Sequence, residues 1–454
     1  MTSSQFTDSS ARIGSHEDLL AYFRSGEKPR SRWRVGSEHE KLGFLRDTLA
    51  PIPFEGPRSI RAVLQGFVER FGWQPVAEGE HTIALLRGAA SITLEPGGQL
   101  ELSGATLVTA HEARAELAQH MAELAEVSRP LNLVWINLGR NPTIPSAQMP
   151  WMPKQRYAIM RRYLPTRGAL ALDMMLGTGT VQTNLDYATE ADMARKLRLG
   201  MTLSPFLTAL FANSPFAEGR VTGYLSTRAH IWTQTDPDRS GFLPAVFRED
   251  FGYRDYAEYA LDVPMFFIHR DGHYRDLAGR SFRRFLDEGL DGEFPTQEDW
   301  ALHLTTLFPE ARLKNYIELR MADVGSPAMI VALAALTRGL FYDETALLEA
   351  SLLFRRLGPQ HLTALHGEAL RQGLRAQVLG RPILDWLRDL LTIVEAGLKR
   401  LGALDEQGRD ETILLEPVRA ILASGQTQAD RLLARWEGEW HHDFASLFKE
   451  LGYP

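Results

Sequence analysis

The 454-residue sequence contains no cysteine, so disulfide bonds, thiolate metal sites and a cysteine nucleophile are excluded. It also lacks a long apolar run, because the stretch from Met329 to Leu336 is far shorter than the roughly 20 residues of a membrane helix. The first 20 residues contain no apolar core of signal-peptide length, and acidic residues appear early. We therefore expect a cytoplasmic protein with no membrane partner.

The sequence also lacks an excess of basic over acidic residues. Lys and Arg number 50 against 57 Asp and Glu, which gives a formal net charge of −7, and no dense basic run is present. Nucleic acid is therefore not an expected partner. The glycine pattern of dinucleotide-binding folds, the phosphate-binding P-loop and the GxSxG nucleophile elbow are also absent.

The hydrophobic periodicity predicts an α+β fold. Helical spacing occurs at 16–24, from Ile60 to Phe71 and around 117–124, and helical patterns dominate from 327 to 454. Strand-like runs lie at 35–44, 81–86, 91–95, 99–103, 131–138, 178–187, 223–233, 263–269 and 315–320. No repeat or linker divides the chain. We predict a single domain over 1–454, with a flexible start at 1–15 and one antiparallel sheet packed by helices ahead of a helical C-terminal third.

The run V-G-S-E-H-E-K-L-G-F at 35–44 places two carboxylates on a half-apolar strand. Because side chains alternate faces along a strand, Glu38 and Glu40 point the same way and His39 points to the opposite face. We therefore interpret His39 as a packing residue. Two like charges held this close need a compensating group or a ligand.

Acids and amides recur with the same period of two in three other strand-like segments. Glu95 ends one run, Pro-Gly-Gly forms the turn, and Gln99 and Glu101 alternate on the return. Further along, Gln182, Asn184 and Asp186 share one face, as do Glu318 and Arg320.

Two interpretations fit these polar faces. An antiparallel sheet often has one solvated face, which needs no ligand. A face lined with Glu and Gln is also a floor for Mg²⁺ or Mn²⁺ with a nucleotide, because these hard cations take oxygen ligands.

Arginines could supply the positive counterpart of this floor. If 223–233 is a strand, Arg228, His230 and Trp232 share a face, and Arg239 follows the Asp-Pro-Asp turn. Guanidinium groups bind carboxylates and phosphates through two parallel hydrogen bonds. The full set of candidates is Arg156, Arg162, Arg228, Arg239 and Arg320.

Seven stretches, in order along the chain, resemble the plant-type glutamate–cysteine ligases that proteobacteria also contain. They are G-S-E-H-E-K-L-G-F, I-T-L-E-P-G-G-Q-L-E-L-S-G-A, M-P-K-Q-R-Y, V-Q-T-N-L-D-Y, R-A-H-I-W-T-Q-T-D-P-D-R-S-G, Y-A-E-Y-A-L-D-V-P-M and Y-I-E-L-R-M-A-D, between residues 36 and 323. Seven ordered matches are more specific than any one of them.

The resemblance implies a fold and a reaction. The fold would be a bowl-shaped antiparallel sheet related to glutamine synthetase. In the reaction, ATP phosphorylates the side-chain carboxylate of L-glutamate, and L-cysteine attacks the acyl phosphate to give γ-glutamylcysteine, the first step of glutathione synthesis. Mg²⁺ or Mn²⁺ would be the cofactor, ATP a co-substrate, and the protein a monomer or homodimer.

The resemblance also implies roles for individual residues. It implies metal binding by Glu38, Glu40, Glu95, Glu101 and Glu318, and catalytic contacts by Arg228, Arg239 and Arg320. Substrate contacts would come from Arg156, Tyr157, Gln182, Asn184, Trp232, Tyr259 and Asp262, with Gln182 standing where related ligases can use a His.

Two departures from the family pattern limit the comparison. After Gly325 the chain continues Ser-Pro-Ala, where many relatives have an aromatic and a basic residue. A thiol switch like that of plant members is impossible because the chain has no cysteine.

Two alternatives stay open: a γ-glutamyl ligase with another amine acceptor, and a non-catalytic relative that binds glutamate or a nucleotide.

Overall fold

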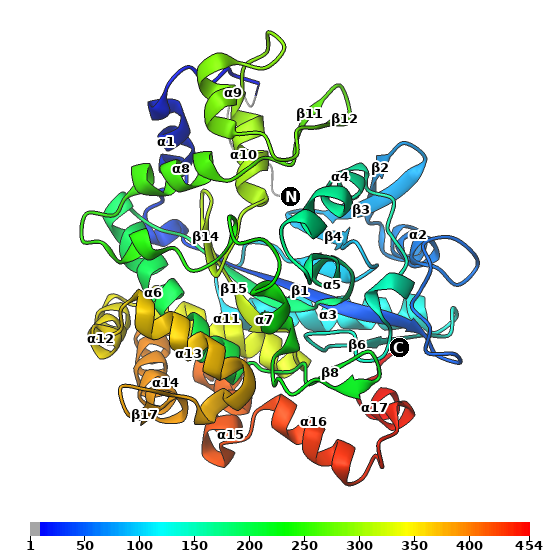
Figure 1. Cartoon of the computed structure of the whole chain (residues 1–454). Coiled ribbons are helices and arrows are strands. Elements are labelled where there is room, and N and C mark those ends of the chain that lie inside the picture. Colours follow the sequence, from blue (N-terminus) through cyan, green and yellow to red (C-terminus); the bar gives the residue numbers. More distant parts are fainter. Residues whose placement is uncertain (1–9) are drawn as a thin grey trace.

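The centre of the molecule is a nine-stranded sheet, seen in the computed structural model of the chain, which describes residues 10–454 (Figure 1). The strand order is β14-β15-β7-β1-β5-β4-β3-β2, and β6 also pairs with β1; every pair is antiparallel. The strands are β1 (Val35–Leu45), β2 (Gln74–Glu78), β3 (His81–Arg87), β4 (Ala90–Leu94), β5 (Leu100–Ser103), β6 (Leu133–Ile136), β7 (Thr180–Leu185), β14 (Ala311–Leu313) and β15 (Ile317–Asp323).

Strand β1 runs through the middle of the sheet, and its two faces have opposite characters. His39 and Lys41 point to the face opposite Glu38 and Glu40, as the alternation predicted; the Lys41 ammonium lies 2.8 Å from His39 Nδ1. The ring of His120 from a covering helix is 5.9 Å from that of His39. This face is closed by packing, and the acids lie on the other face.

Three long helices cover the His39 face of the sheet. They are α3 (Ala110–Ser128), which contacts β1, α6 (Glu190–Leu210), which contacts β14 and β15, and α11 (Pro327–Phe341), which contacts β1 and β7. Helix α3 begins with a capping box between Thr109 and Glu112, and α11 begins with Ser326 as N-cap and Pro327 in its first turn.

The β4–β5 hairpin depends on its glycines. Gly98 has φ +87°, a conformation that L side chains rarely adopt. A Cβ on Gly97 would lie 2.1 Å from the carbonyl oxygen of Leu176, so this turn packs backbone against backbone on the end of α5. The hairpin that carries Glu95 is thereby fixed against the segment that leads into β7.

Shorter elements surround the acidic face. Figure 1 shows α4, α5 and α7 in front of the sheet, with α1, α8, α9, α10 and the β11–β12 hairpin at the top. Helix α2 (Ile60–Phe71) instead packs on α3, where the ring of Phe67 stacks on that of His120. The bounds of the remaining elements before the C-terminal third are α1 (His16–Arg24), α4 (Gln155–Tyr163), α5 (Ala171–Gly177), α7 (Thr227–Trp232), α8 (Tyr253–Asp262), α9 (Phe282–Glu288), α10 (Gln297–Thr305), β8 (Phe216–Ala217), β9 (Arg220–Val221), β10 (Ser240–Gly241), β11 (Phe267–Arg270), β12 (His273–Asp276) and β13 (Phe308–Pro309).

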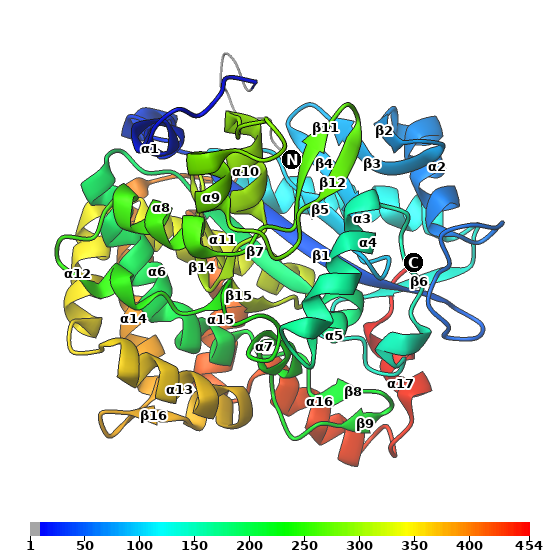
Figure 2. The same cartoon turned by 45° about the horizontal axis from the view of Figure 1, so that its top comes forward.

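The C-terminal third is mainly helical, as predicted. In Figures 1 and 2 its helices, coloured yellow to red, lie along one side and the bottom of the molecule. They are α12 (Glu344–Phe354), α13 (Pro359–Gln372), α14 (Ile383–Leu401), α15 (Glu416–Ser424), α16 (Gln428–Glu437) and α17 (Phe444–Leu451), with the short strands β16 (Gln377–Val378) and β17 (Arg381–Pro382).

The predicted α+β class, with a central antiparallel sheet and helical packing, is confirmed, but one segment was wrong. Residues 223–233 form a loop and helix α7, where Ser226 caps the first turn by accepting from the Ala229 amide. As a consequence His230 does not share a strand face with Arg228 and Trp232; it stacks on Tyr224 with ring centroids 4.0 Å apart.

Several other sequence predictions were incomplete or stay predictions. Strand β2 was missed, and part of the predicted flexible start, residues 1–9, lies outside the described residues. The single-domain assignment, the cytoplasmic location and the monomeric or homodimeric state stay predictions. None of the helices in residues 10–454 is both long and apolar enough to cross a membrane.

Candidate active site

Strand register brings the predicted acids and amides onto one continuous face. Glu38 of β1 lies opposite Gln182 of β7, and Glu40 of β1 lies opposite Glu101 of β5. On the next strand, Glu318 of β15 lies opposite Asn184 of β7. We call this face, with Glu95 at the end of β4, the acidic floor. Its members are Glu38, Glu40, Glu95, Glu101, Gln182, Asn184 and Glu318.

Glu38 sits at the middle of the acidic floor and is held by two amides. Its carboxylate accepts hydrogen bonds from Asn184 Nδ2 at 2.7 Å and from Gln182 Nε2 at 3.4 Å. Burial, with the charges of Glu318 and Glu101, raises the pKa of Glu38 to about 7. The pair of amides orients the carboxylate without neutralising it.

Glu40, Glu95 and Glu101 form the end of the floor next to the β4–β5 hairpin. Burial and the charges of Glu95 and Glu101 raise the pKa of Glu40 well above its ordinary value, although the Thr180 amide donates to it at 3.0 Å. Burial and Glu95 likewise raise the pKa of Glu101, which accepts from the Thr93 hydroxyl at 2.6 Å. Three carboxylates therefore repel one another, because burial limits the screening of their charges by water.

Glu318 has the opposite environment. Burial alone would raise its pKa, but the charges of Arg312, Lys314 and Arg320 outweigh that and bring the pKa below its ordinary value. Its carboxylate lies 3.0 Å from Arg320 Nη1 and 3.7 Å from Lys314 Nζ, and it is paired with Arg312 at hydrogen-bond distance. At this end of the floor, cations of the protein itself therefore balance the negative charge of Glu318.

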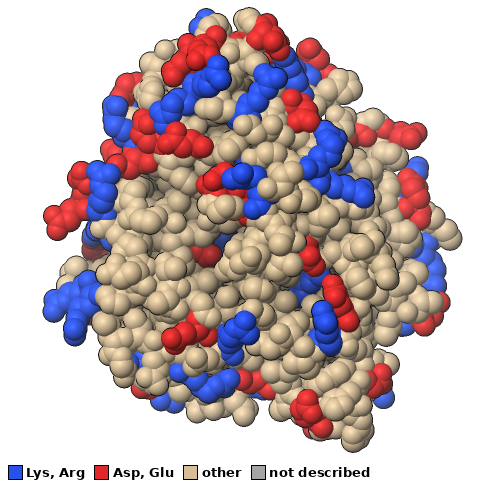
Figure 3. All heavy atoms as spheres, viewed as in Figure 1, with Lys and Arg blue, Asp and Glu red and all other residues tan. Residues whose placement is uncertain are grey.

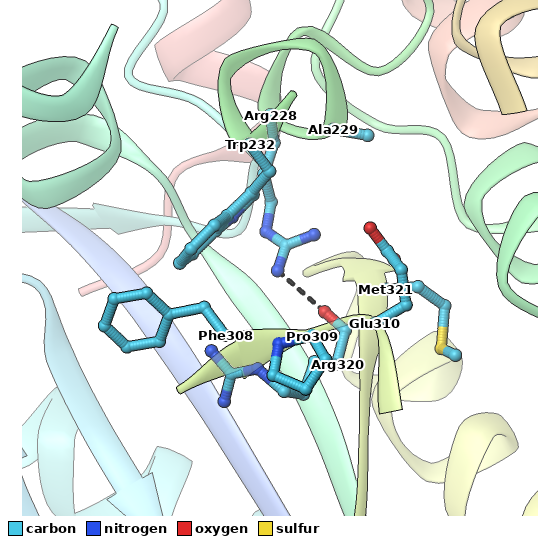
Figure 4. Close-up of a pocket in the computed structure, with 8 residues that line it drawn as sticks. All are labelled: Arg228, Ala229, Trp232, Phe308, Pro309, Glu310, Arg320 and Met321. Atoms are coloured by element: carbon cyan, nitrogen blue, oxygen red, sulfur yellow. Dashed lines mark hydrogen bonds between the residues drawn. The ribbon is translucent and has the colours of Figure 1, made fainter. Parts of the chain in front are cut away.

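Arg228 and Arg320 meet above the floor at the wall of a small pocket (Figure 4). Arg320 donates to Gln182 Oε1 at 2.7 Å, and Arg228 donates to Thr180 Oγ1 at 2.9 Å and to the Arg320 carbonyl at 2.8 Å. The pocket is lined by Arg228, Ala229, Trp232, Phe308, Pro309, Glu310, Arg320 and Met321.

Two donors in this pocket have no acceptor among the described residues. The Nε of Arg228 and the Nε1 of Trp232 are buried and make no hydrogen bond there. The Trp232 and Phe308 rings lie 5.4 Å apart and flank the guanidinium of Arg320 at 5.8 Å. Because buried donors are normally satisfied, these two favour a bound acceptor such as a carboxylate.

Asp323 holds helix α7, and with it Arg228, against the sheet. Its buried carboxylate accepts from the Asn213 amide at 2.9 Å, the Ser214 hydroxyl at 2.6 Å and the Ser226 hydroxyl at 2.8 Å. The guanidinium of Arg228 lies 4.0 Å away. Asp323 is thus a positioning residue, which the sequence motif contained but to which no role was given.

Arg156 and Tyr157 stand at the Glu95 end of the floor. The Tyr157 hydroxyl donates to the Leu94 carbonyl at 2.6 Å, directly before Glu95. The Nε of Arg156 is buried with no hydrogen-bond partner in residues 10–454, and its guanidinium lies 5.3 Å from the Tyr157 ring. The charge of Glu95 contributes to raising the pKa of both side chains.

The structure does not bring three of the predicted residues to the floor. Arg239 is fully buried and donates to Asp236, to the Thr306 carbonyl and to the Pro264 carbonyl. The Tyr259 hydroxyl donates to the Arg239 carbonyl at 3.3 Å. Asp262, with a side chain 70% exposed, pairs with Arg283 at 2.7 Å.

Sequence reasoning gave no role to Arg312 and Lys314, which pair with Glu318, or to Lys154, on which the charges of Glu95 and Glu101 act. Arg312 and Lys314 alternate with period two on either side of Leu313, which is the same signal that revealed the acids. Lys154 stood inside a quoted motif but received no role. A search for basic as well as acidic alternation would have found the first two.

The donor set suits a hard cation. In residues 10–454 no three Asp, Glu or His side chains already stand close enough to chelate one ion. Mg²⁺, however, is usually held by one or two carboxylates, with substrate phosphates and water completing its shell. Glu38, Glu40, Glu95 and Glu101 offer such carboxylates, and burial together with repulsion between the carboxylates raises the pKa values of Glu38, Glu40 and Glu101.

Comparison with known proteins gives the family. The model of glutamate-cysteine ligase family 2 matches residues 34–450. Glutamate–cysteine ligase B, chloroplastic, of Oryza sativa subsp. japonica is 44% identical over 440 residues, covering 96% of this chain and 87% of that protein. The chloroplastic glutamate–cysteine ligase of Arabidopsis thaliana is also 44% identical over 440 residues, covering 96% and 83%.

Solved structures support the fold. A glutamate–cysteine ligase of Francisella tularensis in complex with AMP has a TM-score of 0.56 at 12% identity, covering 91% of this chain and 86% of that one. A bifunctional glutathione synthetase of Pasteurella multocida has a TM-score of 0.51 at 15% identity, covering 96% and 54%. Together with the matched family model and the two plant relatives, the seven motifs lead to one conclusion: the chain belongs to glutamate-cysteine ligase family 2.

Proposed function

We propose that this protein joins the side-chain carboxylate of L-glutamate to the amine of L-cysteine at the expense of ATP. A carboxylate oxygen of glutamate attacks the γ-phosphorus of ATP, which releases ADP and leaves γ-glutamyl phosphate. The cysteine nitrogen then attacks the acyl carbon, phosphate leaves, and the amine loses a proton. The product is γ-glutamylcysteine, and family membership over 96% of the chain is the observation that carries the assignment.

The acidic floor supports the phosphoryl-transfer half of this reaction. Glu38, Glu40, Glu95 and Glu101 would hold Mg²⁺ or Mn²⁺, which when bound neutralises the phosphates of ATP and the transferring group. In the proposed reaction both attacking groups belong to the substrates, so the protein contributes positioning and charge. Gln182 and Asn184 orient Glu38 by donating to it.

The pocket beside Arg228 and Arg320 supports the amino-acid half. The free Nε of Arg228 and the free Nε1 of Trp232 would donate to a carboxylate of glutamate, and Arg320 is held toward the floor by Gln182. Arg156 and Tyr157 would face the phosphate end of the site near Glu95.

Arg239, Tyr259 and Asp262 have no part in this proposal. The side chain of Arg239 is used by the protein itself, and Asp262 is exposed in a pair with Arg283. The Arg239 carbonyl accepts a hydrogen bond from the Phe308 amide, next to the β10–β13 pair. Arg239 therefore fixes the segment that follows α7 to the segment that contains Phe308.

Phosphate release tests the reaction. Purified protein is incubated with ATP, Mg²⁺ and L-glutamate, with L-cysteine, with other amines or with no acceptor, and γ-glutamylcysteine is identified by mass. We expect phosphate release that cysteine stimulates, with one product molecule for each phosphate.

The variant Arg228→Lys, which keeps the charge but loses the planar fork, should raise the KM for glutamate more than that for ATP.

The alternatives give different outcomes. Stimulation by a different amine alone would contradict the cysteine assignment and support a γ-glutamyl ligase with another acceptor. A protein that binds glutamate or ATP yet releases no phosphate with any acceptor would be a non-catalytic relative.

A further inference from the structure

Thr180, the first residue of β7, makes hydrogen bonds to both halves of the site through two different groups. Its backbone amide donates to the Glu40 carboxylate at 3.0 Å. Its hydroxyl accepts from Nη2 of Arg228 at 2.9 Å. Thr180 is only 6% exposed, so water competes little for either contact. One buried residue therefore connects an acid of the floor with the arginine that lines the pocket in Figure 4.

The Thr180 hydroxyl serves Arg228 as an acceptor with a fixed polarity. A hydroxyl has one proton to donate, and that of Thr180 is donated to the Ala322 carbonyl at 3.0 Å. The lone pairs of the oxygen then accept from the Arg228 guanidinium, which can only donate. The contact with Arg228 is therefore lost when a methyl group replaces this hydroxyl.

A bulge in β15 supplies the second acceptor for Arg228. The register of β15 on β7 shifts between Leu319 and Ala322, where β15 has one residue more than its partner strand. Such a bulge interrupts the ladder and turns backbone and side-chain groups in new directions. Here the Arg320 carbonyl accepts from Nη2 of Arg228 at 2.8 Å (Figure 4). The protein thus uses both hydrogens of Nη2, whereas the buried Nε of Arg228 has no acceptor in residues 10–454.

Surface charge gives a substrate no preferred orientation at this site. The face in Figure 3 is viewed as in Figure 1, with α7 in front of the sheet, and its acidic and basic side chains are interspersed. A field that steers a charged ligand needs a region of one sign. The orientation of a bound amino acid therefore depends on short-range contacts such as that of Arg228, and on the groups that hold Arg228 in place.

We propose that Thr180 is a positioning residue that fixes Arg228, the proposed contact of glutamate, relative to Glu40, a proposed metal ligand. The inference rests on the proposed function for the identity of the two ligands. A misplacement of about 1 Å between reacting groups can cost about a hundredfold in rate. Because one residue holds both side chains, Thr180 keeps the glutamate carboxylate at a constant distance from the phosphates of the metal–nucleotide complex.

Thr180→Val separates the two contacts. It removes the hydroxyl, keeps a side chain of similar shape and leaves the backbone amide bond to Glu40 in place. We expect kcat/KM for L-glutamate to fall by about ten- to a hundredfold, the usual scale when a group that orients a binding residue is lost. The KM for ATP should stay unchanged, and Thr180→Ser, which keeps the hydroxyl, should recover most of the loss.

Thr183→Val is the matched control on the same strand. Thr183 is buried and, by the alternation of β7, points to the opposite face, and its hydroxyl has no hydrogen-bond partner in residues 10–454. Its replacement should leave the kinetics as in wild type. Denaturant unfolding of both variants verifies that each is folded, and a merely structural role for Thr180 would raise both KM values.

Calorimetric titration gives a readout that does not require turnover. ADP with Mg²⁺ is titrated into the full-length protein, and L-glutamate is then titrated at saturating ADP with Mg²⁺. Thr180→Val should weaken glutamate binding by about ten- to a hundredfold. Binding of ADP with Mg²⁺ should not change, because the contact of Thr180 with Glu40 comes from the backbone.

The outcomes distinguish this inference from the proposed reaction. Wild-type glutamate affinity and kcat/KM in Thr180→Val would overturn the positioning role even if the protein makes γ-glutamylcysteine. Equal weakening of glutamate and nucleotide binding, or no recovery in Thr180→Ser, would also contradict it. A protein that makes no γ-glutamylcysteine, yet binds glutamate with an affinity that depends on the Thr180 hydroxyl, would support the positioning role and argue against the reaction.

Discussion

The two ends of the acidic floor hold the same kind of side chain in opposite electrostatic states. At one end Glu318 is surrounded by Arg312, Lys314 and Arg320, and its pKa is lowered. At the other end Glu40 and Glu101 face Glu95 and each other, and their pKa values are raised. Burial alone would raise all of these values, so the neighbouring cations make the difference.

The contrast distinguishes Glu318, whose charge is balanced by cations of the protein, from acids whose charge the protein does not balance. Glu318 completes its charge balance within the protein, and its partner Arg320 connects it through Gln182 to the middle of the floor. Glu40, Glu95 and Glu101 lack protein cations at hydrogen-bond distance among the described residues, so a metal–nucleotide complex would supply the missing charge. Under the proposed function, metal binding would therefore fall chiefly to this second end.

The largest expected effect is on stability at the neutralised end. Glu318→Gln leaves Arg312 and Arg320 buried without their carboxylate, and breaking a buried pair in this way costs about 3–5 kcal/mol. Denaturant unfolding at pH 7 measures the loss. As a matched control, Glu344→Gln removes an exposed acid that pairs with Arg195 and should cost less than about 1 kcal/mol. Equal losses in the two variants would remove the distinction between the ends.

The next effect is on turnover at the uncompensated end. Glu101→Gln keeps the size of the side chain and an acceptor for the Thr93 hydroxyl but removes the charge. We expect kcat to fall by about a hundred- to a thousandfold, the scale of losing one electrostatic contact to a transition state, and the Mg²⁺ requirement to rise. Stability should stay level or increase, because one repelling charge is gone.

Glu69→Gln, an exposed acid on α2, is the matched control for that experiment and should behave as wild type. If Glu101→Gln lowers stability as Glu318→Gln does while turnover persists, Glu101 belongs with the structural acids.

A smaller effect is expected in the pH dependence of the metal-free protein. The pKa of Glu38 is raised from 4.5 to about 7, so between these values the folded state binds more protons than the unfolded state and stability falls as pH rises. The fall is at most about 3–4 kcal/mol, at about 1.4 kcal/mol per pKa unit. Unfolding curves from pH 4.5 to 7.5 should show it, and Glu38→Gln should flatten it.

Added Mg²⁺ supplies the check on this prediction. A cation on the floor competes with the proton, so saturating Mg²⁺ with ATP should remove the slope in the wild-type protein. A slope that persists in Glu38→Gln would come from the other carboxyl groups whose pKa values burial raises, which include Glu40 and Glu101 on the floor and Asp323 beside it.

The acids were predictable from the sequence because alternation is a local property. Glu38, Glu40 and Glu101 follow from a period of two along single strands, and the motifs gave their order. The division of the floor was not predictable, because it depends on Arg312 and Lys314 reaching Glu318 from a neighbouring strand. Arg239, after the Asp-Pro-Asp turn, was predicted to make a catalytic contact, but tertiary contacts bury it completely.

Segment 223–233 shows a different limit. Its apolar and polar residues alternate like those of a strand, but Ser226 caps a single helical turn and Asp323, 97 positions away, holds that cap. A contact this distant overrides local propensity. The same contact places Arg228 beside the floor, so the missed element is also the one that carries a proposed substrate contact.

The sheet register has a consequence for how the chain acquires its activity. The acidic floor combines residues as far apart as Glu38 and Glu318, and the strands that bear them pair only through β7. Such distant pairings carry a large loop-closure entropy and form slowly. Recovery of turnover after dilution from denaturant should therefore lag behind recovery of helical circular dichroism, because helices form locally and the floor is among the last parts to assemble.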